Sequence, residues 1–352
     1  MIDTALKGWS KFSHSVKEEV SSIPGLNDLK KQFAQRLMKV VDEIVQEELK
    51  NIPSNLSGEY SEKELKRICN SFANDEVFKS VLGNLTPNLL SYINLLPALI
   101  ESYKTQTRMI SRLAIAMDKK ELLEQKDIIF AIMLNSGAQS ATNILIEKGG
   151  QLIMMNISEK LMNEILSKIS NQFIHSALSS TFTGLVPGIG GAALGLFNRY
   201  MMKKIGLTTI SILSKNIQIS PTESVKLIED QSISLTSKQV QDINCEKLKV
   251  LINLMRIDGD KNGKEFEHIC LLIQKSNLTD AQRLNLYSSL SSPDLFSIHY
   301  ETLKQMEQLE IFIFDLIAFT SYDTSISLQE IAYISRLLNK LELKPIDHYI
   351  MY

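Results

Sequence analysis

The glycine-rich segment in the middle of the chain, residues 183–198, constrains the fold more than any other feature. It holds five of the fifteen glycines in a chain of 352 residues. Gly184 and Gly188 are four residues apart, as are Gly191 and Gly195. On a helix each pair would lie on one face, where the missing side chains let a second backbone approach. The spacing therefore predicts close contact between two helices.

Charge defines two alternatives for this segment. No residue from 169 to 198 carries a formal charge. In the first alternative the segment is a membrane-inserting hairpin that bends at Pro187. The basic residues that follow it, Arg199, Lys203 and Lys204, would then face phospholipid headgroups. In the second it packs inside a soluble bundle, which we favour because each continuous apolar run is shorter than the roughly 20 residues of a spanning helix. Short apolar runs still allow a peripheral or re-entrant insertion, which does not cross the membrane. The membrane or packing face comprises Gly184, Pro187, Gly188, Gly190, Gly191, Gly195, Asn198, Arg199, Lys203 and Lys204.

Apolar residues elsewhere recur at steps of three and four, the period of helices. A helical pattern covers residues 10–50, with a break at Pro24-Gly25, and Ser61 with Glu64 has the form of a capping box. Further helices are predicted over 61–72, 89–117 with an interruption or kink at Pro97, 120–147, 151–180 and up to Leu213. No stretch alternates with period two for long enough to require a sheet. We therefore predict an all-α fold, a helical bundle with a glycine-rich central helix pair.

The composition changes to Ser, Thr, Gln and Asn between about residues 214 and 242, which marks a domain boundary. We expect a helical domain over 1–220, a polar linker over 221–243 and a smaller helical domain over 244–352.

The second domain contains a repeat. Asp258 and Glu265 are separated by seven positions, as are Asp323 and Glu330, and each pair lies between two apolar helical patterns. Two helix-turn-helix units of this kind predict a pseudo-symmetric bundle.

The first turn of this repeat also resembles the start of a calcium-binding loop. Asp258, Asp260 and Asn262 supply oxygen atoms at relative positions one, three and five, but position twelve is Ile269 instead of a bidentate Glu. Together with Glu265 they would make a weak divalent cation site. A polar turn in which Glu265 caps the next helix is the favoured interpretation. Asp323 and Glu330 repeat this capping pattern without the extra ligands, and we expect no other cofactor.

Charge and cysteine content exclude several classes of protein. The net charge of −2 and pI near 6.3 lack the basic surface that nucleic acid requires. The three cysteines form no CxxC pair, which argues against a disulfide framework or thiolate zinc site and favours a reducing cytoplasm. The N-terminus has charges where a secretory signal needs an apolar core. We expect a cytoplasmic protein, peripheral at the inner membrane if the first alternative holds.

No HExxH, phosphate-loop or GxSxG motif occurs. The run from Gly188 to Ala193 fits the loose dinucleotide form G-x-G-x-x-A, but no strand pattern precedes it. His175 lies in the uncharged run, where a histidine is more often part of a core than a catalytic base. A cryptic hydrolase would need a site assembled from distant residues, so we favour a non-enzymatic protein.

Residues 186–198 resemble the glycine-rich signature of EcsC-family proteins, and residues 89–118 resemble the helix that precedes it there. The resemblance covers about residues 25–215. The matching positions are Pro187, Gly190 and Asn198, with Ile205 and Gly206 beyond; Leu194 departs from the pattern, with Gly195 one position late.

The repeat in the second domain resembles TerB-like domains, in which Asp-Gly is followed by a polar stretch and a Glu. Asp258, Gly259 and Glu265 match this pattern, as do Asp323 and Glu330, while Thr324 replaces the glycine.

The two resemblances imply a membrane-associated accessory protein of a stress or defence system, whose EcsC-like domain engages a membrane surface or membrane complex and whose TerB-like domain recruits a protein partner. The alternatives are a soluble helical scaffold or effector, and the cryptic hydrolase.

Overall fold

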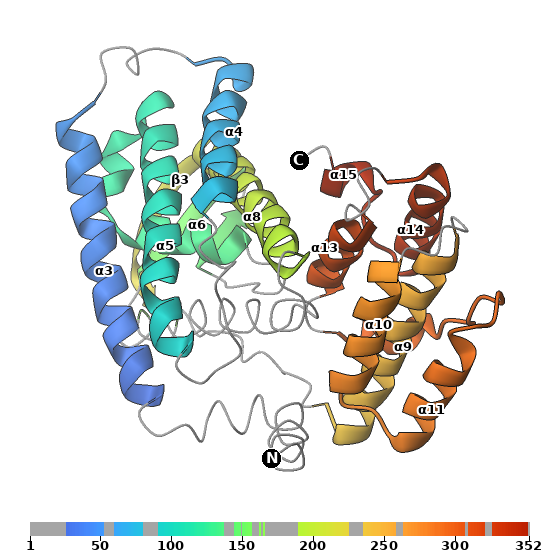
Figure 1. The fold of residues 1–352 in the computed structure, drawn as a ribbon. Helices are drawn as coiled ribbons and strands as arrows, with labels where there is room; N and C mark the ends of the chain where they lie inside the picture. The colour runs from blue at the N-terminus through green and yellow to red at the C-terminus, as the bar shows by residue number, and fades with distance from the viewer. Residues whose placement is uncertain are drawn as a thin grey trace.

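The computed structural model describes residues 26–52, 60–79, 91–136, 144–148, 150–156, 162, 165, 189–224, 235–257, 263–306, 309–320 and 326–350. This part of the chain is mostly helical, with one small sheet, which confirms the predicted fold class (Figure 1). The first group of elements is α3 (Leu26–Lys50), α4 (Glu62–Lys79), α5 (Ser91–Ala116), the 3-10 helix η3 (Lys120–Glu124), α6 (Asp127–Ser136), β1 (Leu145–Lys148), β2 (Gln151–Asn156), α8 (Ile189–Leu213) and β3 (Asn216–Ser224). The second group is α9 (Ser237–Ile257), α10 (Gly263–Lys275), α11 (Asp280–Ser289), α12 (Tyr300–Lys304), α13 (Leu309–Thr320), α14 (Leu328–Lys340) and α15 (Asp347–Ile350).

Several helix limits agree with local sequence signals. α3 begins at Leu26, directly after Pro24-Gly25, and α8 ends at Leu213. At the start of α4, the Ser61 N–H donates to Glu64 Oε2 at 2.8 Å and the Glu64 N–H donates to Ser61 Oγ at 3.4 Å, which confirms the capping box. α5 runs through Pro97 without the predicted interruption.

The prediction that no sheet is needed was wrong. β1 and β2 form an antiparallel hairpin in which Lys148 pairs with Gln151, and β2 pairs in parallel with β3. Gly150 has φ +80°, a conformation that glycine adopts without strain and that suits a tight hairpin turn. The predicted helix over 120–147 is instead η3, α6 and β1, and the helix predicted from 151 onward begins as a strand.

The physical reason lies in the residues around the turn. Leu152 and Met154 are buried while Ile153 is half-buried, so β2 has apolar side chains on both faces. A short run of this kind has the same hydrophobic pattern as a buried helix. Residues 157–188, apart from Met162 and Ile165, lie outside the described residues.

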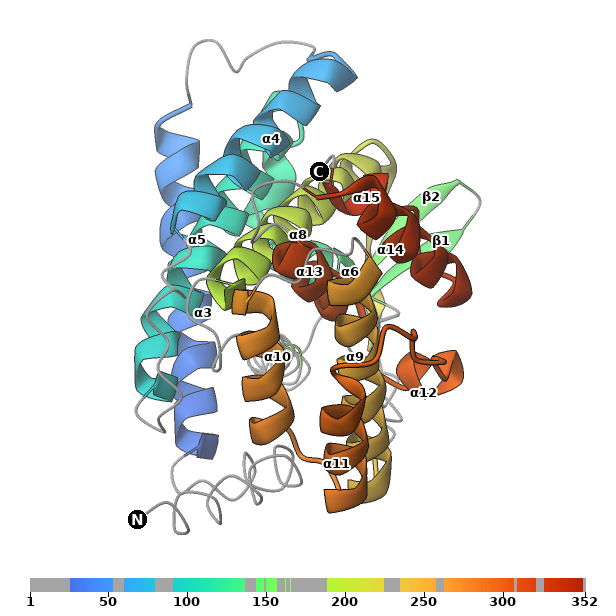
Figure 2. The same ribbon diagram turned by 45° about the vertical axis from the view of Figure 1, so that its right-hand side comes forward.

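The hydrophobic side chains of the described residues form two clusters, which we call the first and second cores. The first core lies among α3, α4, α5, α6, β2 and the C-terminal half of α8. The second core lies among α9 to α15 and receives the N-terminal half of α8. Figures 1 and 2 both show α8 between the two groups of helices, next to α4 on one side and α13 on the other.

Regular structure extends into both ends of the segment expected to be a linker. β3 reaches Ser224 and α9 begins at Ser237. β3 lies at the edge of the sheet, where Pro221 is tolerated because an edge strand has backbone groups that need not join a ladder.

Candidate functional site

The helix α8, which carries the C-terminal part of the glycine-rich segment, supplies side chains to both cores. Met202, Ile205 and Leu213 are buried in the first core. Tyr200 is buried in the second core, and Leu196, Phe197 and Met201 pack against it. The change from one core to the other occurs within a single helical turn. We treat α8 and its contacts as the candidate functional site because no other described element belongs to both cores.

The C-terminal half of α8 is held in the first core by close packing at Gly206. A Cβ atom added to Gly206 would lie 2.5 Å from Cys69 Sγ and 3.0 Å from Cys69 Cβ on α4, and 3.3 Å from Met109 Sδ on α5. The contact with Cys69 Sγ is too short to persist unless a neighbouring atom shifts. The missing side chain at Gly206 therefore lets α8 lie this close to α4 and α5.

The N-terminal half of α8 is held in the second core by aromatic rings. The Tyr200 ring centroid lies 5.4 Å from that of Phe314 on α13, 5.6 Å from that of His348 and 5.9 Å from that of Tyr349 on α15. Phe197 meets Phe314 edge to face at 5.9 Å. Aromatic pairs at these separations contribute about 0.5–1.5 kcal/mol each beyond the burial of their area. We call these five residues the aromatic junction.

Polar contacts surround Tyr200 at the rim of the aromatic junction. The Tyr200 hydroxyl donates to Glu310 Oε1 at 3.0 Å, and Lys204 Nζ lies 3.9 Å from Glu310 Oε2. Lys204 Nζ also lies 5.7 Å from the centre of the Tyr200 ring, which is within the range of a cation–π contact. Glu310, at the start of α13, therefore holds two residues of α8.

The structure places the predicted face of α8 mostly against other helices. Gly195 is buried, Asn198 and Arg199 are half-buried, and Lys203 is only 8% exposed. Burial lowers the pKa of Lys203, with Arg199 acting in the same direction and Cys69 against it. Gly190 and Gly191 belong to α8, but the structure does not describe their burial. Gly184, Pro187 and Gly188 lie outside the described residues.

The predicted cation site is only partly described. Glu265 is buried in the first turn of α10, whereas Asp258, Asp260 and Asn262 lie outside the described residues. Within the described ranges, no group of three or more His, Cys, Asp or Glu side chains could hold a metal ion. In the second half of the repeat, Ser327 and Glu330 form a capping box at the start of α14, which confirms the predicted capping role of Glu330.

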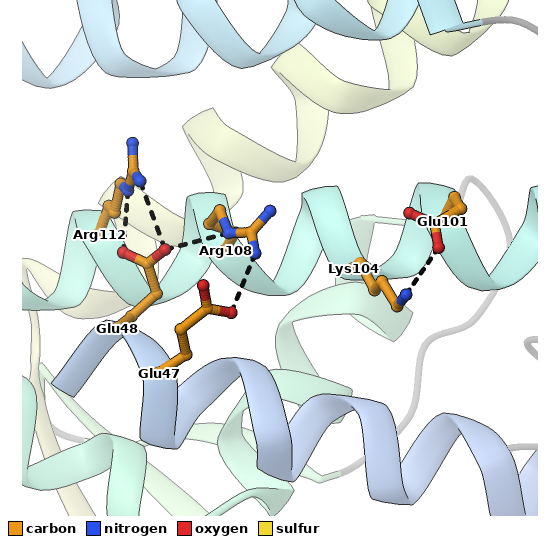
Figure 3. A network of polar contacts seen from close by, with 6 residues as sticks. All are labelled: Glu47, Glu48, Glu101, Lys104, Arg108 and Arg112. Carbon is orange, nitrogen blue, oxygen red and sulfur yellow. Dashed lines mark hydrogen bonds and ion pairs between the residues drawn. The ribbon is translucent and has the colours of Figure 1, made fainter. Parts of the chain in front are cut away.

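A second polar cluster, which sequence reasoning missed, joins α3 to α5 (Figure 3). The buried Glu48 carboxylate accepts from Arg108 Nε at 3.1 Å and from Arg112 Nε at 2.9 Å, while Arg108 Nη2 donates to Glu47 at 3.1 Å. The Arg112 guanidinium lies 5.4 Å from the centre of the Phe72 ring on α4. Arg108 and Arg112 are four residues apart and so lie on one face of α5, but their partner Glu48 is 60 or more positions away and no local pattern points to it.

The cysteine thiols are poor candidates for nucleophilic chemistry. All three are free. Burial raises the pKa of Cys69 to about 11 and also raises the pKa values of Cys245 and Cys270. Each thiol is therefore protonated near neutral pH, and the thiolate is the reactive form. His175 lies outside the described residues.

Buried polar side chains on α9 form a third cluster, which fixes an irregular segment of the second core. Asn253 accepts from the Phe296 N–H at 2.7 Å and donates to the Phe296 carbonyl at 2.9 Å and to Tyr333 Oη at 3.1 Å. Glu246 Oε2 accepts from the His299 N–H at 2.9 Å. These side chains satisfy backbone groups that no helix or sheet supplies with partners.

No family model, no curated protein and no solved structure matches this chain. Among the helices within the described residues, none is both long enough and apolar enough to cross a membrane.

Proposed function

We propose that this chain is a non-catalytic helical scaffold of a stress or defence system, in which α8 joins two cores so that a protein partner meets them as one unit. The proposal rests on one observation: Tyr200 of α8 is buried in the second core, and Ile205, five residues further along the same helix, is buried in the first. A separate anchoring domain would not need to share a helix with its neighbour.

The lysines that follow the glycine-rich segment favour packing of α8 against other helices of the protein. Lys203 is buried, and Lys204 lies beside Glu310 and the Tyr200 ring. Cations that engage phospholipid headgroups need to reach the surface. The contacts of both lysines favour the packing alternative for this part of the segment.

Calorimetry of the full chain tests the coupling. We expect wild-type protein to unfold in one cooperative transition, and Tyr200→Ala to unfold in two, because it removes the ring that α13 and α15 contact. Tyr287→Ala is the matched control, since Tyr287 is 37% exposed on α11, away from α8. Two independent transitions in the wild-type protein would refute the coupling.

Affinity capture from cells extends this test to function. A partner recovered with wild type and with Tyr287→Ala, but lost with Tyr200→Ala, supports a scaffold that needs both cores held together. Equal recovery with all three proteins would contradict it.

A second candidate, a cytoplasmic protein peripheral at the membrane, is favoured by one observation: residues 169–188 carry no formal charge. In this proposal the insertion precedes α8, and α8 connects it to the second core. Flotation with vesicles of phosphatidylcholine and phosphatidylglycerol at low salt distinguishes the two. Wild type that floats, with an Ile174→Glu variant that does not, supports membrane docking through residues 169–188; protein that stays at the bottom in both cases supports the scaffold without it.

A further inference from the structure

The aromatic junction contains one side chain that can change charge near neutral pH, His348. Its ring meets the Tyr200 ring edge on at 5.6 Å, and it is followed by Tyr349, which is only 2% exposed. Both residues belong to α15, a helix of four residues near the C-terminus. The half-buried His348 ring therefore contacts both Tyr200 of α8 and Tyr349, which itself stacks on Tyr200.

The charged groups that act on His348 come from three elements. Glu310 of α13 favours the protonated imidazole, whereas Lys344, which precedes α15, and Lys204 of α8 oppose it. Glu310 is already engaged by the Tyr200 hydroxyl and lies 3.9 Å from Lys204 Nζ. The rings of Tyr200 and Tyr349 also contact His348, and burial raises the pKa of Tyr349 to about 12, so it stays neutral. A proton on His348 would be opposed by Lys344 and Lys204 and favoured by Glu310, a carboxylate that already accepts from Tyr200.

We propose that His348 is a pH-sensitive latch: the neutral imidazole packs on Tyr200 and holds α15 against α8, and its protonation releases α15 from the junction. The latch rests on the proposed function, since it regulates the contact by which α8 reaches the second core. Release of α15 withdraws His348 and Tyr349 from the aromatic junction, while Phe197 and Tyr200 of α8 keep their ring contacts with Phe314 of α13.

The direction of the effect follows from the environment of the imidazole. Burial is the main cause that lowers the pKa of His348 below its ordinary value, with Lys344 and Lys204 acting the same way and Glu310 against them. A lowered pKa means that the folded state binds the proton less well than the released state does. The contact is therefore fully stabilised above the pKa of an exposed histidine, about 6.5, and weakens as the pH falls below it.

Hydrogen exchange of the full chain, followed from about pH 8 to about pH 5 and corrected for the intrinsic exchange rate, tests the latch. We expect the protection of amides in α15 to fall several-fold across this range, because the folded state binds the proton on His348 less well than the released state does. The protection of α5 and α9 should not change. Constant protection of α15 throughout would overturn the proposal.

Two substitutions separate protonation from a general loss of packing. His348→Phe keeps an aromatic ring that cannot gain a proton, so α15 should stay protected at acid pH. His348→Lys carries a charge throughout, so α15 should already be unprotected at about pH 8. His299→Gln is the matched control, because the His299 side chain is exposed and makes no cap hydrogen bond. Loss of protection in His348→Phe with the same pH midpoint as wild type would refute the role of His348.

Charge substitutions on the neighbouring helices give an opposed pair of shifts. Lys204→Met removes a cation that repels the protonated imidazole, so the midpoint pH at which α15 loses protection should rise. Glu310→Gln removes the attracting carboxylate, so the same midpoint pH should fall. Shifts in the same direction would contradict the assignment of these groups. Two-step unfolding of wild type at about pH 8 would refute the coupling by α8, whereas pH-independent protection of α15 in a protein that unfolds in one step would refute the latch alone.

Discussion

The two cores fix their helices by different means. In the first core, α8 packs closely on α4 at Gly206, where an added Cβ atom would lie 2.5 Å from Cys69 Sγ. In the second core, α9 also packs along an irregular segment that includes Phe296, and buried polar side chains hold that backbone. A helix satisfies its own backbone groups while an irregular segment does not. In the second core the buried Asn253 therefore supplies hydrogen bonds that the irregular backbone lacks, whereas the buried Glu48 of the first core pairs with arginine side chains of another helix.

The aromatic junction, where the two kinds of packing meet on α8, should show the largest effect. Phe314 is fully buried and its ring contacts Phe197, Tyr200 and Tyr349. Phe314→Ala should lower the free energy of unfolding by about 3–5 kcal/mol through lost burial and the cavity that remains. Denaturation with urea measures the change, and Phe266→Ala, at a position 44% exposed, should cost far less. Equal losses would mean that the junction adds nothing to the contact of α8 with the second core.

Removal of the hydrogen bonds between Asn253 and the Phe296 backbone should give the second largest loss of stability. Asn253→Ala leaves the Phe296 N–H and carbonyl without their partner, which we expect to cost about 2–4 kcal/mol because the segment is only partly accessible to water. Asn253→Asp keeps an acceptor for the N–H but buries a carboxylate against the Phe296 carbonyl oxygen, so its loss should be at least as large. Asn244→Ala, which removes one long bond of 3.5 Å to the Asn277 carbonyl, is the control for urea denaturation. A loss as small as the control's would remove the contrast between the cores.

Close packing in the first core is tested by Gly206→Ala. Alanine favours the helix by up to about 1 kcal/mol, but overpacking against Cys69 should cost about 1–3 kcal/mol, so a net loss of stability is expected. Adding Cys69→Ala removes the Sγ atom, 2.5 Å from the new Cβ, and should recover part of the loss in a double-mutant cycle. A stabilised Gly206→Ala protein would show that α8 can move away from α4.

The ion pairs between α3 and α5 should give the smallest effects, and two adjacent glutamates make the comparison. Glu48→Gln weakens a buried group that holds two arginines, and we expect about 1–2 kcal/mol, reduced by the partial exposure of both arginines. Glu47→Gln, half-exposed with one arginine, should cost at most about 0.5 kcal/mol. Both losses should be read from urea midpoints at low and high salt. A larger loss at Glu47 would reverse the expected order.

Features encoded by neighbouring residues could be predicted from the sequence. The start of α3 at Leu26, the capping box of Ser61 with Glu64 and the capping role of Glu330 each depend on residues within one helical turn. The all-α class followed from the same period of three and four. Local signals of this kind act before any tertiary contact forms.

Other features depend on contacts that no local pattern contains. Tyr200 and Glu310 are 110 positions apart, and Arg112 and Glu48 are 64 apart, so neither pair leaves a sequence spacing to recognise. β2 was mistaken for a helix because both of its faces carry apolar side chains. The glycine that makes the close contact, Gly206, stands outside the segment whose spacing drew attention, since its need for a small residue is set by Cys69 on another helix.

Because α8 belongs to both cores, recombination that separates the gene segments for the two cores should damage both products. A gene encoding only the residues before α9 would yield a product with Phe197 and Tyr200 turned to water, and a gene encoding only the rest would leave Phe314 uncovered. Exposed aromatic surfaces of this kind promote aggregation. Recombination between α8 and α9 would therefore be selected against, and the two halves should be transmitted and exchanged together.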